Sequence, residues 1–292
     1  MRIGLLTQYP ENGSSSRLIA AACARGHQLR PVNYVRSHIT MSANAPHVVE
    51  DRTTLPLFDA IIPRISASET FHGTAIVRQF EMQGVYTPSS SVGISRSRDK
   101  LHSLQLMAGQ GIAMPITAFG HPTSDARQLI DAVGGAPLIV KIVEGTQGIG
   151  VVLCEQRASA QSAIEAFRAL RGHIVVQEYI PEARGEDLRC FVVGDEVIAA
   201  MVRVAADGEF RSNLHRGGSG RTTTLTDDER KLAVRAARAM DLSIAGVDLL
   251  RSSRGPLVIE VNSSPGLMGI EAATGRNIAA QVIDYVVEKA KG

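Results

Sequence analysis

The segment 245–265 constrains the fold of this chain more than any other stretch. Two runs rich in Val, Ile and Leu flank five turn-prone residues, Arg-Ser-Ser-Arg-Gly, and this pattern predicts an antiparallel hairpin. Because side chains alternate along a strand, Glu260 and Asn262 share one face of the second arm. Pairing across the turn places Asp248 near them, about one residue from the directly opposite position.

Two carboxylates and an amide oxygen on one rigid sheet surface indicate a cation site. Carboxylates held this close repel each other unless a cation lies between them. Oxygen ligands alone suit Mg²⁺ or Mn²⁺ and leave coordination positions for water and phosphate oxygens. The alternative is a solvated outer face of a hairpin, which is common for isolated Asp and Glu. We favour the metal site, with Asp248, Glu260 and Asn262 as its ligands.

Composition narrows the class of protein. The 292 residues are 44% hydrophobic and 21% charged, which is ordinary for a globular enzyme of two or three lobes. A net charge of +2 and the lack of a Lys/Arg run argue against nucleic-acid binding. Three widely spaced cysteines fit a reduced compartment, and no run approaches the ~18 apolar residues that span a bilayer. We expect a cytoplasmic protein without a signal peptide or membrane contact.

Alternating strand and helix patterns predict three lobes. Residues 1–94 indicate a small α/β lobe with a mostly parallel sheet, in which 40–56 is a loop with marginal strand content. A boundary follows, with Ser97 as the N-cap of a helix that carries Lys100. The expected strands are 3–7, 60–63, 138–142, 149–153, 174–177, 188–193 and 197–204, and the other expected helices are 15–25, 70–82, 159–170, 226–240 and 277–289.

A glycine-rich loop follows Lys141. Gly145, Gly148 and Gly150 let the backbone approach a phosphate closely and present N–H groups to it. Lys141 would lie beside such a phosphate as a point charge. The spacing matches neither a P-loop nor a dinucleotide-binding fingerprint, and a strand follows, so we expect a hairpin flap. An ordinary glycine-rich turn with a surface lysine has equal weight on this segment alone.

Other segments offer polar groups for a nucleotide. The strand that ends near Glu178 leaves backbone groups that could read an adenine edge, although an ordinary strand end is the simpler interpretation. Asp187 and Arg189 share a strand face and could bind ribose, phosphate or carboxylate. The loop 210–218, with two arginines, an asparagine and two glycines, could hold anionic oxygens or could be a solvated basic loop.

No nucleophile stands beside a base, since the chain has neither Gly-x-Ser-x-Gly nor a poised Cys–His pair. Phosphoryl transfer depends on positioning and charge neutralisation more than on covalent side-chain chemistry. Metal oxygens, a glycine flap, lysines and arginines therefore favour phosphoryl transfer over hydrolysis.

In order along the chain, these residues resemble the ATP-grasp ligases. Three motifs resemble the RimK branch more narrowly, and Pro-Arg-Ile at 63–65 is similar to the same branch. The three are Val-Lys-Ile-Val-Glu-Gly-Thr-Gln-Gly-Ile-Gly at 140–150, Phe-Arg-Ser-Asn-Leu-His-Arg-Gly-Gly at 210–218 and Glu-Val-Asn-Ser-Ser-Pro-Gly-Leu at 260–267. Enzymes of this branch add glutamate to the C-terminus of ribosomal protein number six of the small subunit.

The resemblance covers nearly the whole chain and implies an α/β fold with α+β lobes. It implies an N-terminal pre-ATP-grasp α/β domain at 1–94, a central ATP-grasp lobe at 95–178 and a C-terminal ATP-grasp lobe with the metal site at 179–292. ATP would be clamped between the last two lobes, with two Mg²⁺ or Mn²⁺ ions on the hairpin. The implied nucleotide-binding residues are Lys100, Lys141, Glu144, Gly145, Gly148, Gly150, Gln177, Glu178, Tyr179, Ile180, Asp187, Arg211, Ser212 and Asn213.

One position departs from the family pattern. Many ATP-grasp ligases carry an arginine shortly before the first metal carboxylate, and this chain has Gly246 there. The arginine that stabilises the acyl-phosphate step must then come from elsewhere. Arg203 and Arg211 are the first candidates, and Arg189 is the third.

The resemblance implies an ATP-dependent carboxylate–amine ligase that forms ADP and phosphate. L-glutamate and a ribosomal protein C-terminus are the expected substrates, poly-α-glutamate is a further possible product, and a homo-oligomer is expected. Two alternatives stay open. One is ligation to a small-molecule cofactor or an amino-group carrier protein, and the other is a nucleotide-binding regulatory protein.

Overall fold

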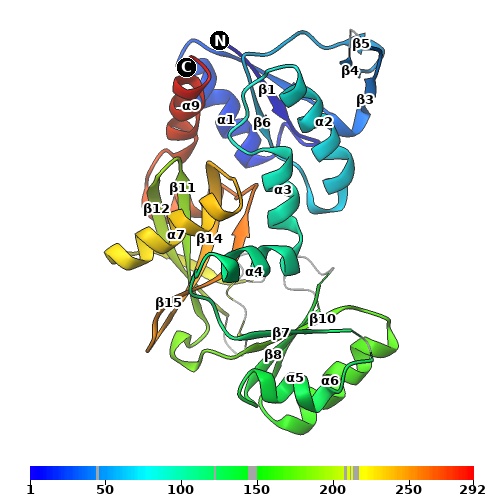
Figure 1. The fold of residues 1–292 in the computed structure, drawn as a ribbon. Coiled ribbons are helices and arrows are strands. Elements are labelled where there is room, and N and C mark those ends of the chain that lie inside the picture. Colours follow the sequence, from blue (N-terminus) through cyan, green and yellow to red (C-terminus); the bar gives the residue numbers. More distant parts are fainter. Residues whose placement is uncertain (44–45, 122, 144–149, 207–208, 211, 213–216) are drawn as a thin grey trace.

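A computed structural model describes residues 1–43, 46–121, 123–143, 150–206, 209–210, 212 and 217–292. Figure 1 shows a first lobe that contains both termini, a second lobe at the opposite end of the molecule, and a third sheet between them. Within the described residues no helix is both long and apolar enough to span a membrane.

The first lobe is built on a parallel sheet, as the alternating pattern predicted. Its strand order is β2-β1-β6, formed by Gln28–Val32, Arg2–Leu6 and Ala60–Pro63. Helices α1 (Gly13–Ala24) and α2 (Thr70–Met82) complete this lobe.

The segment 40–56, expected to be a loop with marginal strand content, contains more strand than expected. Ser37–Thr40, His47–Glu50 and Thr53–Thr54 form a small antiparallel sheet, β3-β4-β5. Val48 and Val49 of β4 are buried, and Val48 belongs to the core cluster that includes Tyr34. Such short strands hold too few residues for a period to be recognised in the sequence.

Two helices join the first lobe to the rest of the chain. Helix α3 (Ser91–Arg98) packs on α2, and α4 (Lys100–Gly109) begins directly after it. The N-cap of α4 is Asp99, whose carboxylate accepts from the His102 amide at 2.9 Å. The prediction of Ser97 as the cap is therefore wrong, because Ser97 lies inside α3 and its hydroxyl donates to the Ile94 carbonyl.

The second lobe is an antiparallel sheet with helices on one face (Figure 1). Its order is β7-β10-β8-β9, with β7 (Thr117–Gly120), β10 (Ile174–Glu178), β8 (Leu138–Ile142) and β9 (Val151–Cys154). Helices α5 (Ala126–Ala132) and α6 (Arg157–Ala169) bury apolar side chains against it, and these form a separate core cluster.

The third sheet carries the hairpin predicted at the C-terminal end. Its order is β13-β12-β11-β14-β15, with β13 (Ser219–Thr222), β12 (Glu196–Val204), β11 (Glu186–Val193), β14 (Ile244–Ser252) and β15 (Gly255–Asn262). Helix α7 (Asp227–Ala239) packs on one face, and reciprocal bonds between Thr226 and Glu229 form a capping box at its start.

The two faces of this sheet pack against different parts of the molecule. Along β11, Leu188, Cys190 and Val192 pack toward α7, whereas Phe191 and Val193 pack against the first lobe. Strand alternation puts Asp187 and Arg189 on the same face as Phe191. One face is thus apolar where it meets the first lobe and polar further along the strand.

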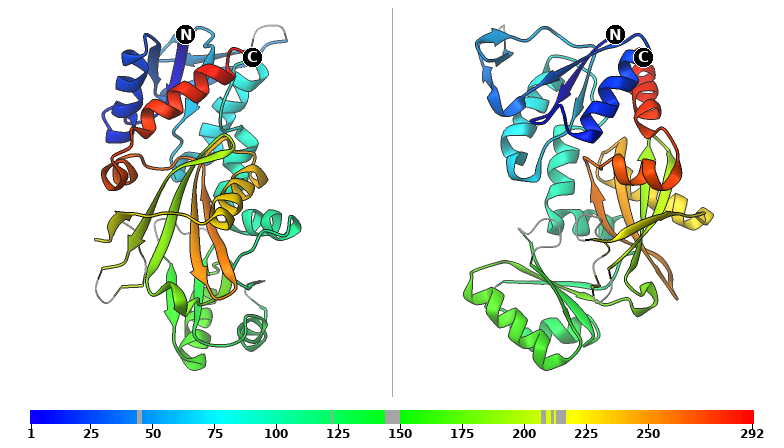
Figure 2. Two further views of the ribbon diagram at one scale, coloured as in Figure 1. Left: turned by 90° about the vertical axis from the view of Figure 1, so that its left-hand side faces the viewer. Right: turned by 180° about the vertical axis from the view of Figure 1, so that it is seen from behind.

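The last two helices connect the third sheet to the first lobe. These are α8 (Met268–Thr274) and α9 (Ile278–Lys289), and α9 packs beside α1, as both views of Figure 2 show. Ile3 and Leu5 of β1 share a core cluster with Ile283 and Val286 of α9. The first lobe and the third sheet therefore share one hydrophobic core, which fixes their relative position.

Gly93 tests this rigid connection. A Cβ at this position of α3 would contact the Asp241 carbonyl oxygen and lie 2.7 Å from that of Met240, and backbone cannot move aside cheaply. We expect Gly93→Ala to lower the free energy of unfolding by roughly 1–3 kcal/mol. Gly109→Ala in α4 is the control, because no atom lies within 4 Å of its Cβ position, and it should be neutral or stabilise by up to about 1 kcal/mol. Equal effects in denaturant titrations would contradict the close contact.

Candidate active site

The hairpin brings its polar side chains together. Asp248 of β14 lies directly opposite Glu260 of β15, and Gly246 lies opposite Asn262. The expected offset of one residue is wrong, because an irregularity next to Asp248 leaves Ile259 without a direct partner and restores the register. Asp248, Glu260 and Asn262 therefore share one face of the sheet, as the sequence predicted.

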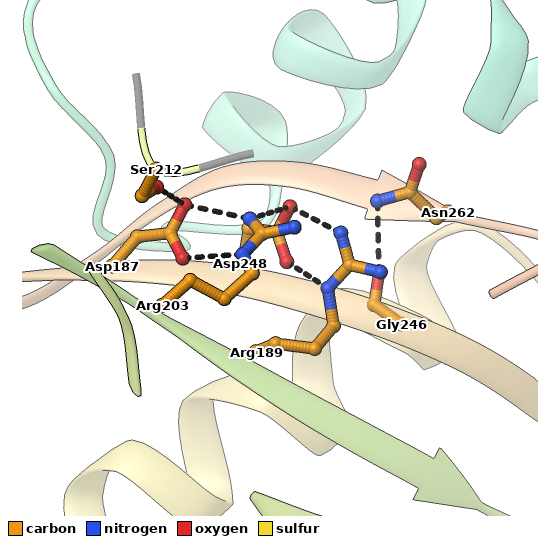
Figure 3. Close-up of polar contacts among 7 residues, drawn as sticks. All are labelled: Asp187, Arg189, Arg203, Ser212, Gly246, Asp248 and Asn262. Atoms are coloured by element: carbon orange, nitrogen blue, oxygen red, sulfur yellow. Dashed lines mark hydrogen bonds and ion pairs between the residues drawn. The ribbon is translucent and has the colours of Figure 1, made fainter. Parts of the chain in front are cut away.

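Asp248 is held by two arginines from neighbouring strands, as Figure 3 shows. Arg189 of β11 donates from Nε to Oδ1 and from Nη2 to Oδ2, the latter at 2.8 Å, and Arg203 of β12 donates from Nη2 to Oδ2 at 2.8 Å. The Asp248 side chain is only 2% exposed. Burial would raise its pKa, but the two guanidinium groups hold the pKa of this carboxyl below its usual value.

Arg203 links a second carboxylate to the same network. Its Nε and Nη2 donate to the two oxygens of Asp187 at 2.7 and 2.6 Å, and the Ser212 hydroxyl donates to Asp187 Oδ2 at 2.6 Å. Burial would lower the pKa of Arg203, but the charges of Asp248 and Asp187 raise it instead. Arg203 therefore bridges two buried carboxylates that would otherwise repel each other.

Glu260 is the carboxylate that this network leaves uncompensated. Within the described residues it accepts no hydrogen bond and forms no ion pair, although it faces Asp248 across the hairpin. Its side chain is exposed and lines the cavity between the lobes, where the surrounding protein desolvates it. Its pKa is raised, first by this desolvation and then by the charge of Asp248, while Arg189, Lys100 and Lys141 act in the opposite direction.

The cavity has a volume of ≈ 970 Å³ and is lined by residues of all three lobes. It collects many of the residues predicted to bind a nucleotide or metal: Lys100, Lys141, Gln177, Glu178, Tyr179, Ile180, Asp187, Ser212, Glu260 and Asn262. Asp248, Arg203 and Gly150 are not part of its wall. The predicted residues Glu144, Gly145, Gly148, Arg211 and Asn213 lie outside the described residues.

Two lysines line the cavity, Lys141 on β8 of the second lobe and Lys100 at the start of α4. Lys141 Nζ donates to Gln177 Oε1 at 2.6 Å, and Gln177 in turn donates to the Thr117 hydroxyl at 2.8 Å. Lys100 Nζ donates to the Val143 carbonyl at 2.9 Å. Burial lowers the pKa of Lys141 to about 8, with a smaller contribution from Lys100 and an opposing one from Glu260. Lys141 is thus a desolvated cation that gains from a bound anion.

The strand β10 ends at Glu178, as predicted, and Tyr179 and Ile180 continue as irregular chain along the cavity. The carboxylate of Glu178 accepts from the Ile116 amide at 2.7 Å and also from Arg254. This side chain therefore fixes the start of β7 and the tip of the hairpin. The Glu178 carboxylate is thus engaged by the protein, and the backbone of the segment is available to recognise a base edge.

The donor chemistry of the hairpin fits a divalent cation. No group of three His, Cys, Asp or Glu side chains in the described ranges could hold a metal ion, so such a site depends on Glu260, Asp248 and the Asn262 amide. All three supply oxygen, which suits Mg²⁺ or Mn²⁺. Asn262 Nδ2 points to the Gly246 carbonyl at 3.5 Å, so its Oδ1 is directed elsewhere (Figure 3).

The glycine at position 246 makes room for an arginine. A Cβ there would lie 3.2 Å from Arg189 Nη1 and 2.8 Å from the Cβ of Pro265. The guanidinium of Arg189 therefore occupies the space beside this strand position, next to Asp248. Arg189 pairs with Asp248 across β11 and β14, so its guanidinium lies beside Gly246, the position at which the sequence departs from the family pattern.

A cationic end of the same cavity was not predicted from the sequence. Arg64 follows β6, Arg98 ends α3, and both line the cavity together with Ser263 and Ser264, which follow β15. A signal was available, because Arg64 lies within the Pro-Arg-Ile motif at 63–65 and both serines lie within the motif at 260–267.

Comparison with known proteins defines the class first. The family model of the RimK-like ATP-grasp domain matches residues 97–286, and the family model of the RimK PreATP-grasp domain matches residues 1–94. The fold is an ATP-grasp fold preceded by a pre-ATP-grasp domain. The chain belongs to the RimK family, and it is an ATP-dependent carboxylate–amine ligase.

Relatives agree over the whole length. A probable alpha-L-glutamate ligase 1 of Shewanella amazonensis is 58% identical over 292 residues, covering 99% of this chain and 96% of the relative. A probable alpha-L-glutamate ligase of Vibrio cholerae serotype O1 is 55% identical over 290 residues, with the same 99% and 96% coverage.

Solved structures share the fold at low identity. The ATP-grasp ligase PsnB, complexed with a phosphomimetic precursor variant, Mg and ADP, has a TM-score of 0.76 at 20% identity, covering 99% of this chain and 98% of PsnB. D-alanine–D-alanine ligase from Bacillus anthracis, complexed with ATP, has a TM-score of 0.71 at 18% identity, covering 100% of this chain and 97% of that enzyme.

The charge network gives a stability prediction. Arg203→Met removes the cation between two buried carboxylates, and we expect the free energy of unfolding to fall by roughly 3–5 kcal/mol. The control is Arg221→Met on the neighbouring edge strand, where an exposed pair with Glu186 should contribute about 1 kcal/mol or less. Denaturant titrations of both variants measure the difference. Similar losses in the two variants would show that Arg203 does not hold the network together.

Proposed function

We propose that this chain transfers L-glutamate to the C-terminal carboxylate of a small-subunit ribosomal protein, by way of an acyl phosphate. The observation that carries the proposal is the cavity where Glu260, Asn262 and Lys141 meet between the lobes. The names of the full-length relatives support glutamate as the added amino acid. A further PsnB complex, solved with the precursor peptide PsnA2 and AMPPNP, supports a peptide acceptor. Cytoplasmic location, a homo-oligomer and repeated addition of glutamate belong to the same proposal.

In this proposal the second and third lobes hold ATP between them. Lys141 and Lys100 contact the phosphates, the strand end at 178–180 reads the adenine edge, and Asp187 lies near the ribose. The nucleotide contacts expected at Glu144, Gly145, Gly148, Arg211 and Asn213 stay predictions, because these positions lie outside the described residues. Asp248, Glu260 and Asn262 would hold magnesium or manganese ions, which supply positive charge to the transferring phosphoryl group when bound.

The chemistry has two steps. A carboxylate oxygen of the acceptor attacks the γ-phosphorus, the bond from that phosphorus to its bridging oxygen breaks, and ADP leaves. The amine of glutamate then adds to the acyl carbon, phosphate leaves, and the amine gives up a proton as the peptide bond forms. The walls of the cavity keep water from the acyl phosphate, which would otherwise hydrolyse.

Arg189 is our choice for the guanidinium near the acyl carbon. It lines the cavity, it stands beside Gly246, and its Nη1 takes no part in the bonds to Asp248. Arg203 is further from this role, because its Nε and Nη2 donate to the two buried carboxylates and it does not line the cavity. Arg203 then acts by holding Asp187 and Asp248 in place.

Product mass tests the proposed function. The protein is incubated with ATP, Mg²⁺, L-glutamate and a peptide with the C-terminus of the ribosomal protein, and each product is weighed. The proposal expects additions of whole glutamyl residues and one ADP for each. If glutamate were transferred only to a small molecule or a carrier protein, the ribosomal protein would not be the acceptor. Nucleotide binding without any amino-acid-dependent ADP release would favour a regulatory protein and contradict ligation.

The lowered pKa of Lys141 predicts a proton uptake. At pH 8 the lysine is close to half protonated in the free protein, and a bound phosphate should restore its charge by raising its pKa. Binding of a non-hydrolysable ATP analogue at pH 8 should take up roughly half a proton more in wild type than in Lys141→Met. Near pH 6 the lysine is already charged, so this difference should vanish. Calorimetry in buffers of different ionisation enthalpy measures the uptake, and equal uptake at pH 8 would remove Lys141 from the phosphate site.

A further inference from the structure

Two arginines lie at the first-lobe end of the cavity without a carboxylate partner. Arg64 Nη1 donates to the Pro265 carbonyl at 2.6 Å, and Arg98 Nη2 donates to the Ile65 carbonyl at 2.7 Å. In the described part of the chain neither arginine forms an ion pair with a carboxylate. They differ in this from Arg203, whose charge is balanced by Asp187 and Asp248.

This arrangement is unfavourable for the protein alone. Burial lowers the pKa of Arg64 to about 10, and the positive charge of Arg98 contributes to the shift. Burial also lowers the pKa of Arg98, against opposing effects of Glu260 and Tyr34. The Nε of Arg98 is buried and has no hydrogen-bond acceptor among the described residues. An anion placed between the guanidinium groups would relieve each of these penalties.

Two serines add donors to the same end of the cavity. Ser263 and Ser264 directly follow the metal-site residue Asn262, and both line the cavity. Their hydroxyl groups are buried, and within the described ranges neither has a hydrogen-bond partner. Arg64 bonds to the carbonyl of the next residue, Pro265, so this loop and the arginine lie together.

A purely structural role explains only part of this cluster. The bonds to the carbonyls of Pro265 and Ile65 tie the first lobe to the loop after β15, and each uses a single nitrogen of a guanidinium group. The other N–H groups and both serine hydroxyls keep their hydrogen-bonding capacity. Planar guanidinium groups match the two oxygens of a carboxylate better than any other common anion-binding side chain.

We propose that Arg64 and Arg98, with the hydroxyls of Ser263 and Ser264, bind a carboxylate of the incoming L-glutamate. The inference rests on the proposed function. The acceptor carboxylate must meet ATP, whose expected contacts Lys141, Gln177 and Asp187 come from the other two lobes. Glutamate keeps both of its carboxylates through the reaction, so a permanent cationic subsite suits it. Arg98 lines the same cavity as Glu260, so the subsite and the expected metal site open into one space.

Glutamate binding to the protein loaded with ADP and Mg²⁺ tests the subsite without turnover. We expect Arg98→Gln and Arg64→Gln to weaken L-glutamate binding by roughly ten- to a hundredfold, as charge-assisted hydrogen bonds are lost, with ADP affinity unchanged. Arg96→Gln is the matched control, because it makes the same change in α3 but does not line the cavity, and it should bind glutamate as wild type does. Unchanged glutamate affinity in the Arg64 and Arg98 variants would overturn the proposal.

Analogues identify the bound group. L-glutamine and the α-amide of glutamate each replace one carboxylate, and wild type should reject the analogue that lacks the bound one. Arg98→Gln should lose this discrimination. If Arg98→Gln does not fold, Arg98→Lys keeps the charge but not the planar fork and should show a smaller loss in the same direction. Discrimination that persists in the folded variant contradicts the assignment.

Steady-state kinetics show whether the carboxylate bound by Arg64 and Arg98 belongs to glutamate or to the acceptor peptide. The proposal expects the KM for glutamate to rise in Arg98→Gln while the KM for the acceptor peptide stays constant. A rise only for the peptide would assign the subsite to the acceptor and overturn the glutamate assignment. Failure of the proposed function looks different, because wild type itself would then transfer glutamate to no acceptor.

Discussion

The buried ion network of Asp187, Arg203, Asp248 and Arg189 is the interaction on which the site depends. It crosses three adjacent strands, β12, β11 and β14, and joins each to the next by side chains as well as by the backbone. Removing Arg203 would leave the buried carboxylate of Asp187 without a cation, which is more costly than any exposed ion pair is favourable. The network therefore fixes the distance between the nucleotide side of the cavity and the hairpin.

The same network compensates the charge of one hairpin carboxylate and not that of the other. Asp248 is already neutralised by guanidinium groups, so it adds little attraction for a free cation. Glu260 faces it across the hairpin without a partner in the described residues, and its raised pKa reflects that isolation. A cation gains most from Glu260, and it gains more once ATP brings phosphate oxygens to complete the coordination. The cavity is thereby arranged to take nucleotide and metal together.

Much of this could be predicted from local sequence patterns. The hairpin with Asp248 and Glu260, the strands 188–193 and 197–204, and the helix at 226–240 each depend on neighbouring residues, and the structure has all of them. The partners of Asp248 could not be predicted, because the pairing of β11 with β14 joins strands that are distant in the sequence. Arg64 and Arg98 were missed for the same reason: their meeting with Ser263 depends on how the first lobe packs on the third sheet.

Direct measurement of Mn²⁺ binding by electron paramagnetic resonance tests the central claim, that the arginines compensate Asp248 and leave Glu260 as the carboxylate that attracts the metal. The account predicts weak binding to the free protein and at least about tenfold tighter binding with a non-hydrolysable ATP analogue. In Glu260→Gln, which removes a charge but little volume, the nucleotide-dependent binding should be lost while the fold is retained. Equally tight Mn²⁺ binding to wild type with and without nucleotide, or to Glu260→Gln, would contradict it.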